Sequence, residues 1–119
     1  MLALTYDNLF LIIFLLFLHW IGDFLFQSDK VALNKSKDDQ ILSYHCFLYC
    51  LPLCIVDPIW AIFNGVLHFV VDFFTSRINA SLWEKDKRHW FFTMIGLDQL
   101  IHYTILFSTL THFQNHGWI

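Results

Sequence analysis

The chain has 119 residues, enough for one domain, and only 14% of them are charged, whereas soluble domains carry about 25%. Hydrophobic residues make up 57% and aromatic residues 19%, more apolar surface than a water-soluble fold of this size can expose without aggregating. The net charge is -3, and the seven Lys and Arg residues form no basic stripe with interleaved aromatics, which argues against nucleic acid as a partner. The composition indicates a protein whose solvent is lipid.

Four segments are long and apolar enough, or nearly so, to cross a bilayer, which takes about 20 residues. The expected spans are residues 7–27, 39–56, 58–78 and 90–113. The second is the shortest, although Asp38 is suited to cap its start, because the Asp57-Pro58 pair ends it. The sequence therefore predicts an all-α fold, an integral membrane four-helix bundle.

The basic residues predict how this bundle is oriented. All seven fall in or beside the first and third connections: Lys30, Lys35, Lys37, Arg77, Lys85, Lys87 and Arg88. The positive-inside rule places these connections in the cytoplasm and both termini on the non-cytoplasmic side. Trp83 and Trp90 then fall at the cytoplasmic interface, and Trp60 and Trp118 at the outer one, as in an aromatic belt.

Each expected span also carries ionisable side chains. They are His19 and Asp23 in the first, His45 in the second, His68 and Asp72 in the third, and Asp98 and His102 in the fourth. A charged residue at the bilayer centre costs about 2.5 to 3.5 kcal/mol, so such residues normally face the bundle interior and mark function.

The spacing of these residues predicts a polar layer with two levels. Asp23, His45, Asp72 and Asp98 form the level nearer the cytoplasm, and His19, His68 and His102 form the level above it. Three spans carry a His/Asp pair four residues apart, which projects from one helical face. The first and third spans read His then Asp, and the fourth reads Asp then His. Because the fourth span runs in the opposite direction, the Asp of each pair lies nearer the cytoplasm and its His about 6 Å deeper.

This layer has the composition of a metal site. Its four histidines and three aspartates exceed the ligands of one zinc ion but suit two metals that share a bridging carboxylate. With no thiolate present, zinc is expected, and manganese or iron is chemically allowed. The expected ligands are His19, His45, His68, Asp72 and His102. Asp23 or Asp98 would bridge the ions or act as the general base toward water.

Four polar residues near the layer are expected to support the ligands by hydrogen bonds: Gln27, Tyr44, Asn64 and Gln99. Interfacial solvation explains Gln27 equally, and a tyrosine at the lipid interface explains Tyr44. Two alternatives to a metal site stay open for the whole layer. One is a metal-free proton relay or ion path, and the other is a structural hydrogen-bond network that specifies helix packing.

Several strings in the expected site have counterparts in a known family. They are His19-Trp20-Ile21-Gly22-Asp23-Phe24 with Gln27, Lys35-Ser36, His45, His68-Phe69-Val70-Val71-Asp72, and Asp98-Gln99 with His102. Together they resemble the membrane family called domain of unknown function 3307, over nearly the whole chain. That family has no assigned activity, so the resemblance supports the site and implies no particular reaction.

A second, local likeness involves the third span. Gly65, His68, Asp72 and Thr75 form a G-x-x-H-x-x-x-D-x-x-T segment. It is similar to a segment of the YdjM-type inner-membrane proteins, which are described as metal-dependent hydrolases, although their H-R-G-x-T-H segment does not occur here. This likeness implies hydrolysis and the inner, cytoplasmic membrane of a bacterium.

The leading expectation is a membrane-embedded, metal-dependent hydrolase of a lipid or lipid-linked phosphate or ester, because the layer lies where head groups and water meet. Membrane lipid is the expected partner, and a homo-oligomer is compatible with the sequence. The alternatives are a metal-ion or proton carrier or channel, and a non-enzymatic interaction protein with a structural metal. The stretch from Leu9 to Leu18 has no polar group, which argues against a path through the membrane.

Overall fold

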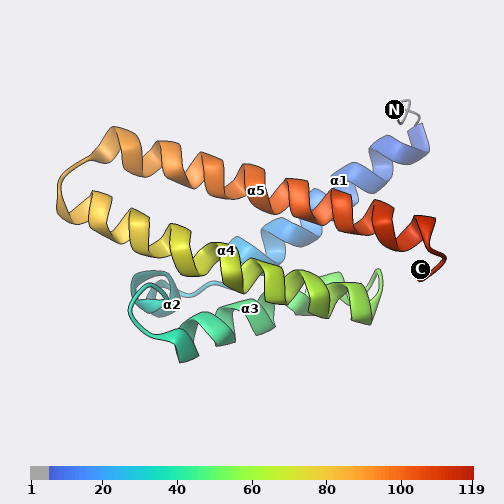
Figure 1. Ribbon diagram of the computed structural model, residues 1–119, viewed down its shortest axis with the longest axis horizontal. Coiled ribbons are helices and arrows are strands. Elements are labelled where there is room, and N and C mark those ends of the chain that lie inside the picture. The colour runs from blue at the N-terminus through green and yellow to red at the C-terminus, as the bar shows by residue number, and fades with distance from the viewer. Residues whose placement is uncertain (1–5) are drawn as a thin grey trace.

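A computed structural model describes residues 6–119 of the chain, with side chains from residue 8 onward, and every regular element in that range is a helix (Figure 1). The elements are α1 (Tyr6–Trp20), the π-helix η1 (Ile21–Leu25), α2 (Asp29–Asn34), α3 (Asp39–Leu53), α4 (Pro58–Glu84) and α5 (Arg88–Asn115). The expectation of an all-α fold is confirmed.

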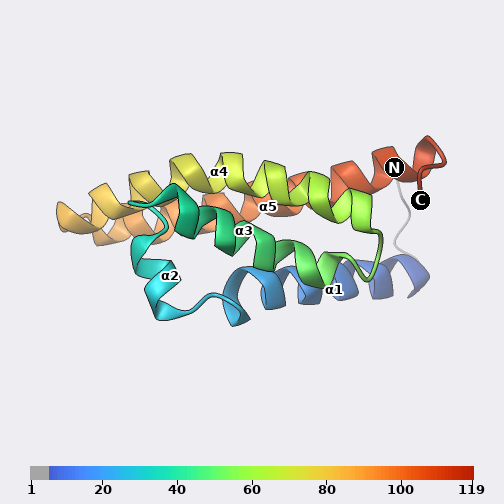
Figure 2. The same ribbon diagram turned by 90° about the horizontal axis from the view of Figure 1, so that it is seen from below.

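The helices are arranged so that α3 lies between α1 and a long hairpin. Helices α4 and α5 run antiparallel and pack along each other, while α3 packs against α4 on one side and against η1 and α1 on the other (Figures 1 and 2). The start of α1, the α3–α4 turn and the end of α5 share one end of the molecule, and α2 and the α4–α5 turn lie at the opposite end.

Side-chain caps set where α3 and α4 begin. The carboxylate of Asp38 accepts the Gln40 backbone N–H at 2.8 Å, which confirms the expected cap of α3. Asp57 accepts the Trp60 N–H at 2.8 Å in front of Pro58, whose missing N–H costs nothing in the first turn of α4. Only residues 54–57 connect α3 to α4, and the two helices therefore lie side by side.

Two helices extend or add to what the sequence predicts. Helix α4 passes the expected end at residue 78 and continues to Glu84, because residues 79–84 contain neither Gly nor Pro. The turn that follows reverses at Asp86, which has a φ of 57°. The first connection contains the short helix α2, whose start is capped by Ser28. Both features shape the same end of the molecule.

Two stretches are long and apolar enough to cross a membrane, Asn8–Leu25 and Pro58–Glu84. Helix α3 has 15 residues, fewer than the roughly 20 that a bilayer requires, and α5 has 28 residues but a more polar sequence. The crossing of a membrane by α3 and α5 and the side on which the termini lie stay predictions.

Polar and apolar side chains are distributed in reverse of the usual order. Phe10 and Ile59 are each 72% exposed, whereas His19 and His45 are 0% exposed. Every long helix presents large apolar side chains outward and buries ionisable ones inward. A water-soluble protein has few buried ionisable groups and few large exposed apolar patches. Here buried ionisable side chains and exposed apolar side chains occur on every long helix, a distribution that suits a lipid surrounding.

An apolar cluster fills the interior between the buried histidines and the end of the molecule where α1 starts and α5 stops. It consists of Leu15, Leu18, Tyr49, Leu53, Trp60, Ala61, Leu106, Leu110 and Phe113. Trp60, expected in the outer aromatic belt, is instead 0% exposed, and its indole N–H donates to Thr109 Oγ1 at 2.9 Å. The expectation for Trp60 is wrong because its helix turns this residue toward α5.

Two glycines allow the helices that carry the buried polar groups to approach closely. A Cβ atom added at Gly22 would lie 3.0 Å from the carbonyl oxygen of Tyr49 and 3.1 Å from its Cα, so η1 touches the backbone of α3. A Cβ at Gly65 would overlap the sulfur of Cys50, where α4 meets α3. The contact at Gly22 needs the absence of a side chain, because it is made with backbone, whereas a side chain at position 65 would have to displace the Cys50 sulfur.

Candidate metal site

The ionisable residues of the four long segments meet in one buried cluster midway along the molecule. Asp23 reaches it from the π-helix η1, in which the Phe26 N–H bonds to the Ile21 carbonyl at 2.9 Å, five residues back. Such π turns are rare and are frequent at functional sites. The wider turn carries Asp23 into the interior beside Gly22.

Four donor atoms of this cluster lie at closely similar separations. We call Asp23 Oδ1, His45 Nε2, His68 Nε2 and Asp72 Oδ2 the four-donor group. The two imidazole nitrogens are 3.2 Å apart, and Asp23 Oδ1 lies 3.1 Å from His45 and 3.3 Å from His68. Asp72 Oδ2 lies 3.4 Å from His45 Nε2 and 3.5 Å from His68 Nε2. Donors bound at about 2.0 to 2.1 Å to a tetrahedral zinc ion stand about 3.3 Å apart, so this spacing suits such an ion.

The charges of the cluster also suit a divalent cation. Three carboxylates, those of Asp23, Asp72 and Asp98, meet in the buried interior, and Lys35 is the lysine that pairs with them. Two negative charges stay uncompensated if the histidines are neutral, and each buried unpaired charge costs several kcal/mol. A divalent ion would neutralise these two charges and remove the cost. Protonation of two histidines would do the same, and a metal-free proton relay would use that protonated state.

Stacking fixes the orientation of the histidine rings. The His68 ring lies between those of Tyr49 and His102, each with its centroid at 4.0 Å. The outward nitrogens, Nδ1 of His45 and of His68, are buried and have no hydrogen-bond partner among the described residues. In many metal sites the second ring N–H of each histidine donates to a carboxylate or a carbonyl oxygen, which fixes the ring. Here the His68 ring is held by aromatic packing.

Lys35 contacts the four-donor group from outside the helices. It follows α2, and its Nζ donates to Asp72 Oδ2 at 2.8 Å. Burial disfavours the charged ammonium, but the nearby carboxylates of Asp72 and Asp23 outweigh that effect, and the pKa of Lys35 is raised above its ordinary value. Lys35 is thus a permanent cation beside one ligand oxygen.

A second set of donors adjoins the first. Asp23, Asp98 and His102 each offer an atom within 4.8 Å of the others, and we call them the three-donor group. His102 Nε2 lies 3.2 Å from Asp98 Oδ1 and 3.0 Å from Asp72 Oδ1. The Thr75 hydroxyl donates to Asp98 Oδ1 at 2.6 Å, which fixes that carboxylate. Asp23 belongs to both groups.

A chain of hydrogen bonds crosses the deep side of the cluster. The Gln99 amide donates to Asp23 Oδ2 at 3.0 Å and to Asp98 Oδ2 at 3.3 Å, so its oxygen accepts from His19 Nε2 at 2.8 Å. His19 Nδ1 is then the acceptor for the Tyr49 hydroxyl at 2.9 Å. Both ring nitrogens of His19 are engaged by protein groups in this arrangement.

A cavity of about 550 Å³ leads from the cluster toward α2 and the α4–α5 turn. Asp23, Asp72, Asp98 and Gln99 form its polar floor. Its apolar walls include Phe24, Leu33, Trp83, Phe91 and Ile95, and Lys35 and Lys37 line it as well. The carboxylates of both donor groups are therefore accessible from one end of the molecule.

The structure brings most of the predicted site residues together. His19, Asp23, His45, His68, Asp72, Asp98 and His102 all lie in the cluster, with Gln99 between two of its carboxylates. Gln27 lines the cavity, Asn64 donates to the Trp60 carbonyl and to Thr109, and Tyr44 is exposed. Which of these residues ligate a metal or transfer protons stays a prediction.

Three residues of the cluster are not among the predicted ligands, catalytic residues or supporting residues: Lys35, Tyr49 and Thr75. Helical spacing carries a signal for two of them, because Tyr49 stands four residues after His45 and Thr75 three residues after Asp72. Lys35 lies in the connection between α2 and α3, and residue spacing in a connection does not predict where a side chain points.

Comparison with known proteins identifies a family but no function. No curated protein and no solved structure matches the chain. The sequence pattern of the family described as protein of unknown function (DUF3307) matches residues 11–117, a range that contains both donor groups. The chain therefore belongs to the DUF3307 family.

Proposed function

We propose that the protein is a membrane-embedded, metal-dependent hydrolase that acts on a lipid or lipid-linked phosphate or ester. The observation that carries this proposal is the cavity of about 550 Å³, which joins apolar walls to a floor of buried carboxylates at a candidate metal site. Concave sites with apolar walls and a few convergent polar groups are where small-molecule ligands bind.

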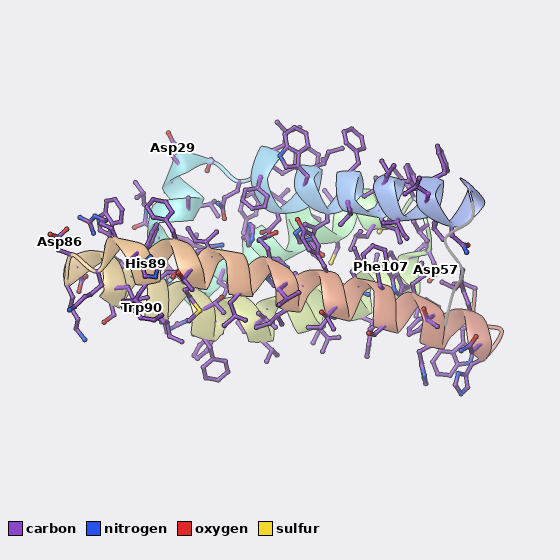
Figure 3. All side chains as sticks on the ribbon, turned by 90° about the horizontal axis from the view of Figure 1, so that it is seen from above. Asp29, Asp57, Asp86, His89, Trp90 and Phe107 are labelled. Carbon is purple, nitrogen blue, oxygen red and sulfur yellow. The ribbon has the colours of Figure 1, made fainter. Side chains whose placement is uncertain are left out.

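The outward apolar faces of the helices support a membrane location. Large side chains such as Phe47 on α3 and Phe92 on α5 are at least 60% exposed, so the two helices without a clear membrane-spanning composition also present apolar surface. We infer that all four long segments cross the membrane, in the inner membrane of a bacterium, with both termini on the non-cytoplasmic side. Figure 3 shows Asp29 and Asp86 at one end of the molecule and Asp57 at the other, so charged residues flank the apolar middle at both ends.

The shape and polarity of the cavity suit an amphiphile. Phe24, Leu33 and Phe91 offer contacts to an acyl or prenyl chain, and the carboxylate floor lies where the head group of that chain would arrive. The cavity leads toward the end that carries the lysines, which the positive-inside rule assigns to the cytoplasm. The substrate would therefore come from the cytoplasmic leaflet.

A divalent ion, zinc in the first place and manganese or iron as alternatives, would supply Lewis acidity and make water nucleophilic at neutral pH. The four-donor group would hold the ion, which would take up water as a fifth ligand, and Lys35 would limit the negative charge at Asp72. When water attacks the phosphorus or carbonyl atom, Asp23 or Asp98 accepts its proton and returns it to the oxygen that leaves. The products are the free acid or phosphate and an alcohol.

A carrier or channel is less well supported, because such a protein needs polar groups on both sides of the cluster. On the far side the buried Asn64 and the half-buried Thr109 bond to each other and to Trp60. The apolar cluster that includes Leu15 and Leu106 fills the rest of the interior there. A purely structural metal would also leave the cavity without a role. Hydrolysis uses both the cluster and the cavity.

The test is a turnover assay on protein purified in detergent and loaded with Zn²⁺ or Mn²⁺. Phospholipids, prenyl phosphates and lipid esters are offered in mixed micelles, and the release of phosphate, head group or acid is measured. We expect one class to be hydrolysed, with a loss of at least about 100-fold in Asp72→Asn. Ile95→Trp fills the cavity and is expected to keep its metal but lose turnover.

Thr104→Val is the matched control, since Thr104 is exposed on α5 and its hydroxyl bonds to the Leu100 carbonyl of its own helix. It should retain full turnover. A metal-loaded, folded wild type that hydrolyses no class, or an Asp72→Asn protein as active as wild type, would show that the proposal is wrong.

A further inference from the structure

We propose that the three-donor group of Asp23, Asp98 and His102 binds a second divalent cation, and that this cation, with one protein ligand fewer than the first, keeps a coordination position that faces the cavity. One part of this inference rests on the proposed function: the assignment of an anionic substrate group to the free coordination position of the second ion. The cation site itself follows from the donor geometry.

The two oxygens of the Asp23 carboxylate have different neighbours. Oδ1 lies 3.1 Å from His45 Nε2 and 3.3 Å from His68 Nε2, within the four-donor group. Oδ2 lies on the other side, 3.0 Å from Gln99 Nε2 and 3.4 Å from His19 Nε2. Gln99 Nε2 also donates to Asp98 Oδ2 at 3.3 Å, so the second oxygen of Asp23 faces the side on which Asp98 lies. With its first oxygen in the four-donor group, the Asp23 carboxylate would bridge the two ions.

The two oxygens of the Asp72 carboxylate also have different neighbours. Its Oδ2 belongs to the four-donor group, and its Oδ1 lies 3.0 Å from the Nε2 atom of His102. The separation of 3.2 Å between His102 Nε2 and Asp98 Oδ1 falls in the range found within the four-donor group. The two donor groups are thus adjacent and similarly spaced.

The groups differ in how many positions they leave for other ligands. Four protein donors fill a tetrahedral ion, as in structural sites, whereas three donors leave one position for water or substrate, as in catalytic sites. Asp23 and Asp98 both line the cavity, and the Asp98 side chain is 14% exposed, compared with 0% for His45. The free position of the second ion would therefore face the cavity.

Charge balance favours a phosphate group at that position. One divalent ion neutralises the two negative charges left by the three carboxylates and Lys35. A second ion leaves two positive charges, which a phosphate dianion would match and an uncharged ester would not. The second site thus narrows the proposed substrates to amphiphiles with a phosphate group.

The experiment counts metal ions. Wild-type protein is stripped with a chelator, loaded with Mn²⁺, freed of excess metal, and analysed by mass spectrometry of the metal and by electron paramagnetic resonance. We expect two Mn²⁺ per chain with the signal of an exchange-coupled pair. Asp98→Asn and His102→Gln should each bind one ion, without coupling, and Thr104→Val should bind two.

Inorganic phosphate then probes the open position. Added to wild type it should change the resonance signal, and added to Asp98→Asn it should not. Circular dichroism identifies a variant that fails to fold, and the two substitutions test the site independently. Saturation of wild type at one Mn²⁺, or two ions in both variants, overturns the second site but leaves the proposed function with a single ion. A wild type that binds none overturns both.

Discussion

Gly22→Ala tests whether η1 touches α3 as closely as the site requires. In most helices this replacement stabilises by about 0.5 to 1 kcal/mol, because alanine has less conformational entropy to lose on folding. Here the new methyl group would lie 3.0 and 3.1 Å from backbone atoms of Tyr49, which cannot rotate away. Overpacking of this kind costs typically about 1 to 3 kcal/mol, so the net effect is destabilising by about 1 kcal/mol.

Gly96→Ala is the matched control, since no atom of the described residues lies within 4 Å of a Cβ at that helical position. It should stabilise by up to about 1 kcal/mol, which places the two variants about 2 kcal/mol apart. Thermal unfolding in detergent should separate their midpoints by roughly 8 °C, at about 4 °C per kcal/mol for a chain of this size. If Gly22→Ala is stabilised as much as Gly96→Ala, the close packing of η1 on α3 is refuted.

Two further predictions concern polar contacts on either side of the cluster. Thr109→Val removes the acceptor of the Trp60 indole and the Asn64 amide and should destabilise by about 2 kcal/mol without changing metal content, as measured by thermal unfolding and metal analysis. Lys35→Met should destabilise chelator-treated protein by roughly 3 kcal/mol and tighten cation binding in a chelator competition, because it removes the cation beside Asp72. Since the pKa of Lys35 is raised, the contribution of the lysine to stability should be fully present from neutral pH up to its ordinary pKa of 10.5, and should be lost as the pH rises through the higher pKa of the folded protein. Equal metal affinity in both proteins would contradict the assigned role of the lysine.

The polar layer was predictable because helix geometry fixes which residues share a face. The pairs His68/Asp72 and Asp98/His102 are four residues apart, and both reach the cluster. Their reversed order along the sequence follows from the antiparallel course of α4 and α5. Helix starts were similarly readable, since Asp38 precedes a helix in a sequence suited to capping.

The partners within the layer were not predictable from spacing. A four-residue interval places His19 on the face of Asp23 but does not determine which atoms it meets, and its nitrogens engage Gln99 and Tyr49. The π turn of η1 changes the direction of Asp23 in a way that an ideal α-helix does not anticipate. Lys35 arrives from a connection whose path depends on the whole fold.

The exposed and buried faces were predictable in kind but not in detail. An apolar sequence with ionisable residues at helical intervals predicts polar groups inside and apolar groups outside, as observed. Trp60 is an exception to the prediction. A tryptophan near a helix start is typical of a membrane interface, but Trp60 is fully buried. Its burial depends on Thr109, which lies far along the sequence and accepts its N–H.

The most direct measurement of the central claim is the divalent-metal content of the protein after purification without chelator, compared with His68→Gln and Asp72→Asn. Each substitution replaces one donor of the four-donor group by an uncharged amide, a weaker ligand, and changes side-chain size little. We predict bound metal in the wild type, its loss from both variants, and a helical circular dichroism spectrum in all three. A folded wild type that contains no metal and gains no thermal stability when Zn²⁺ or Mn²⁺ is added would contradict the account.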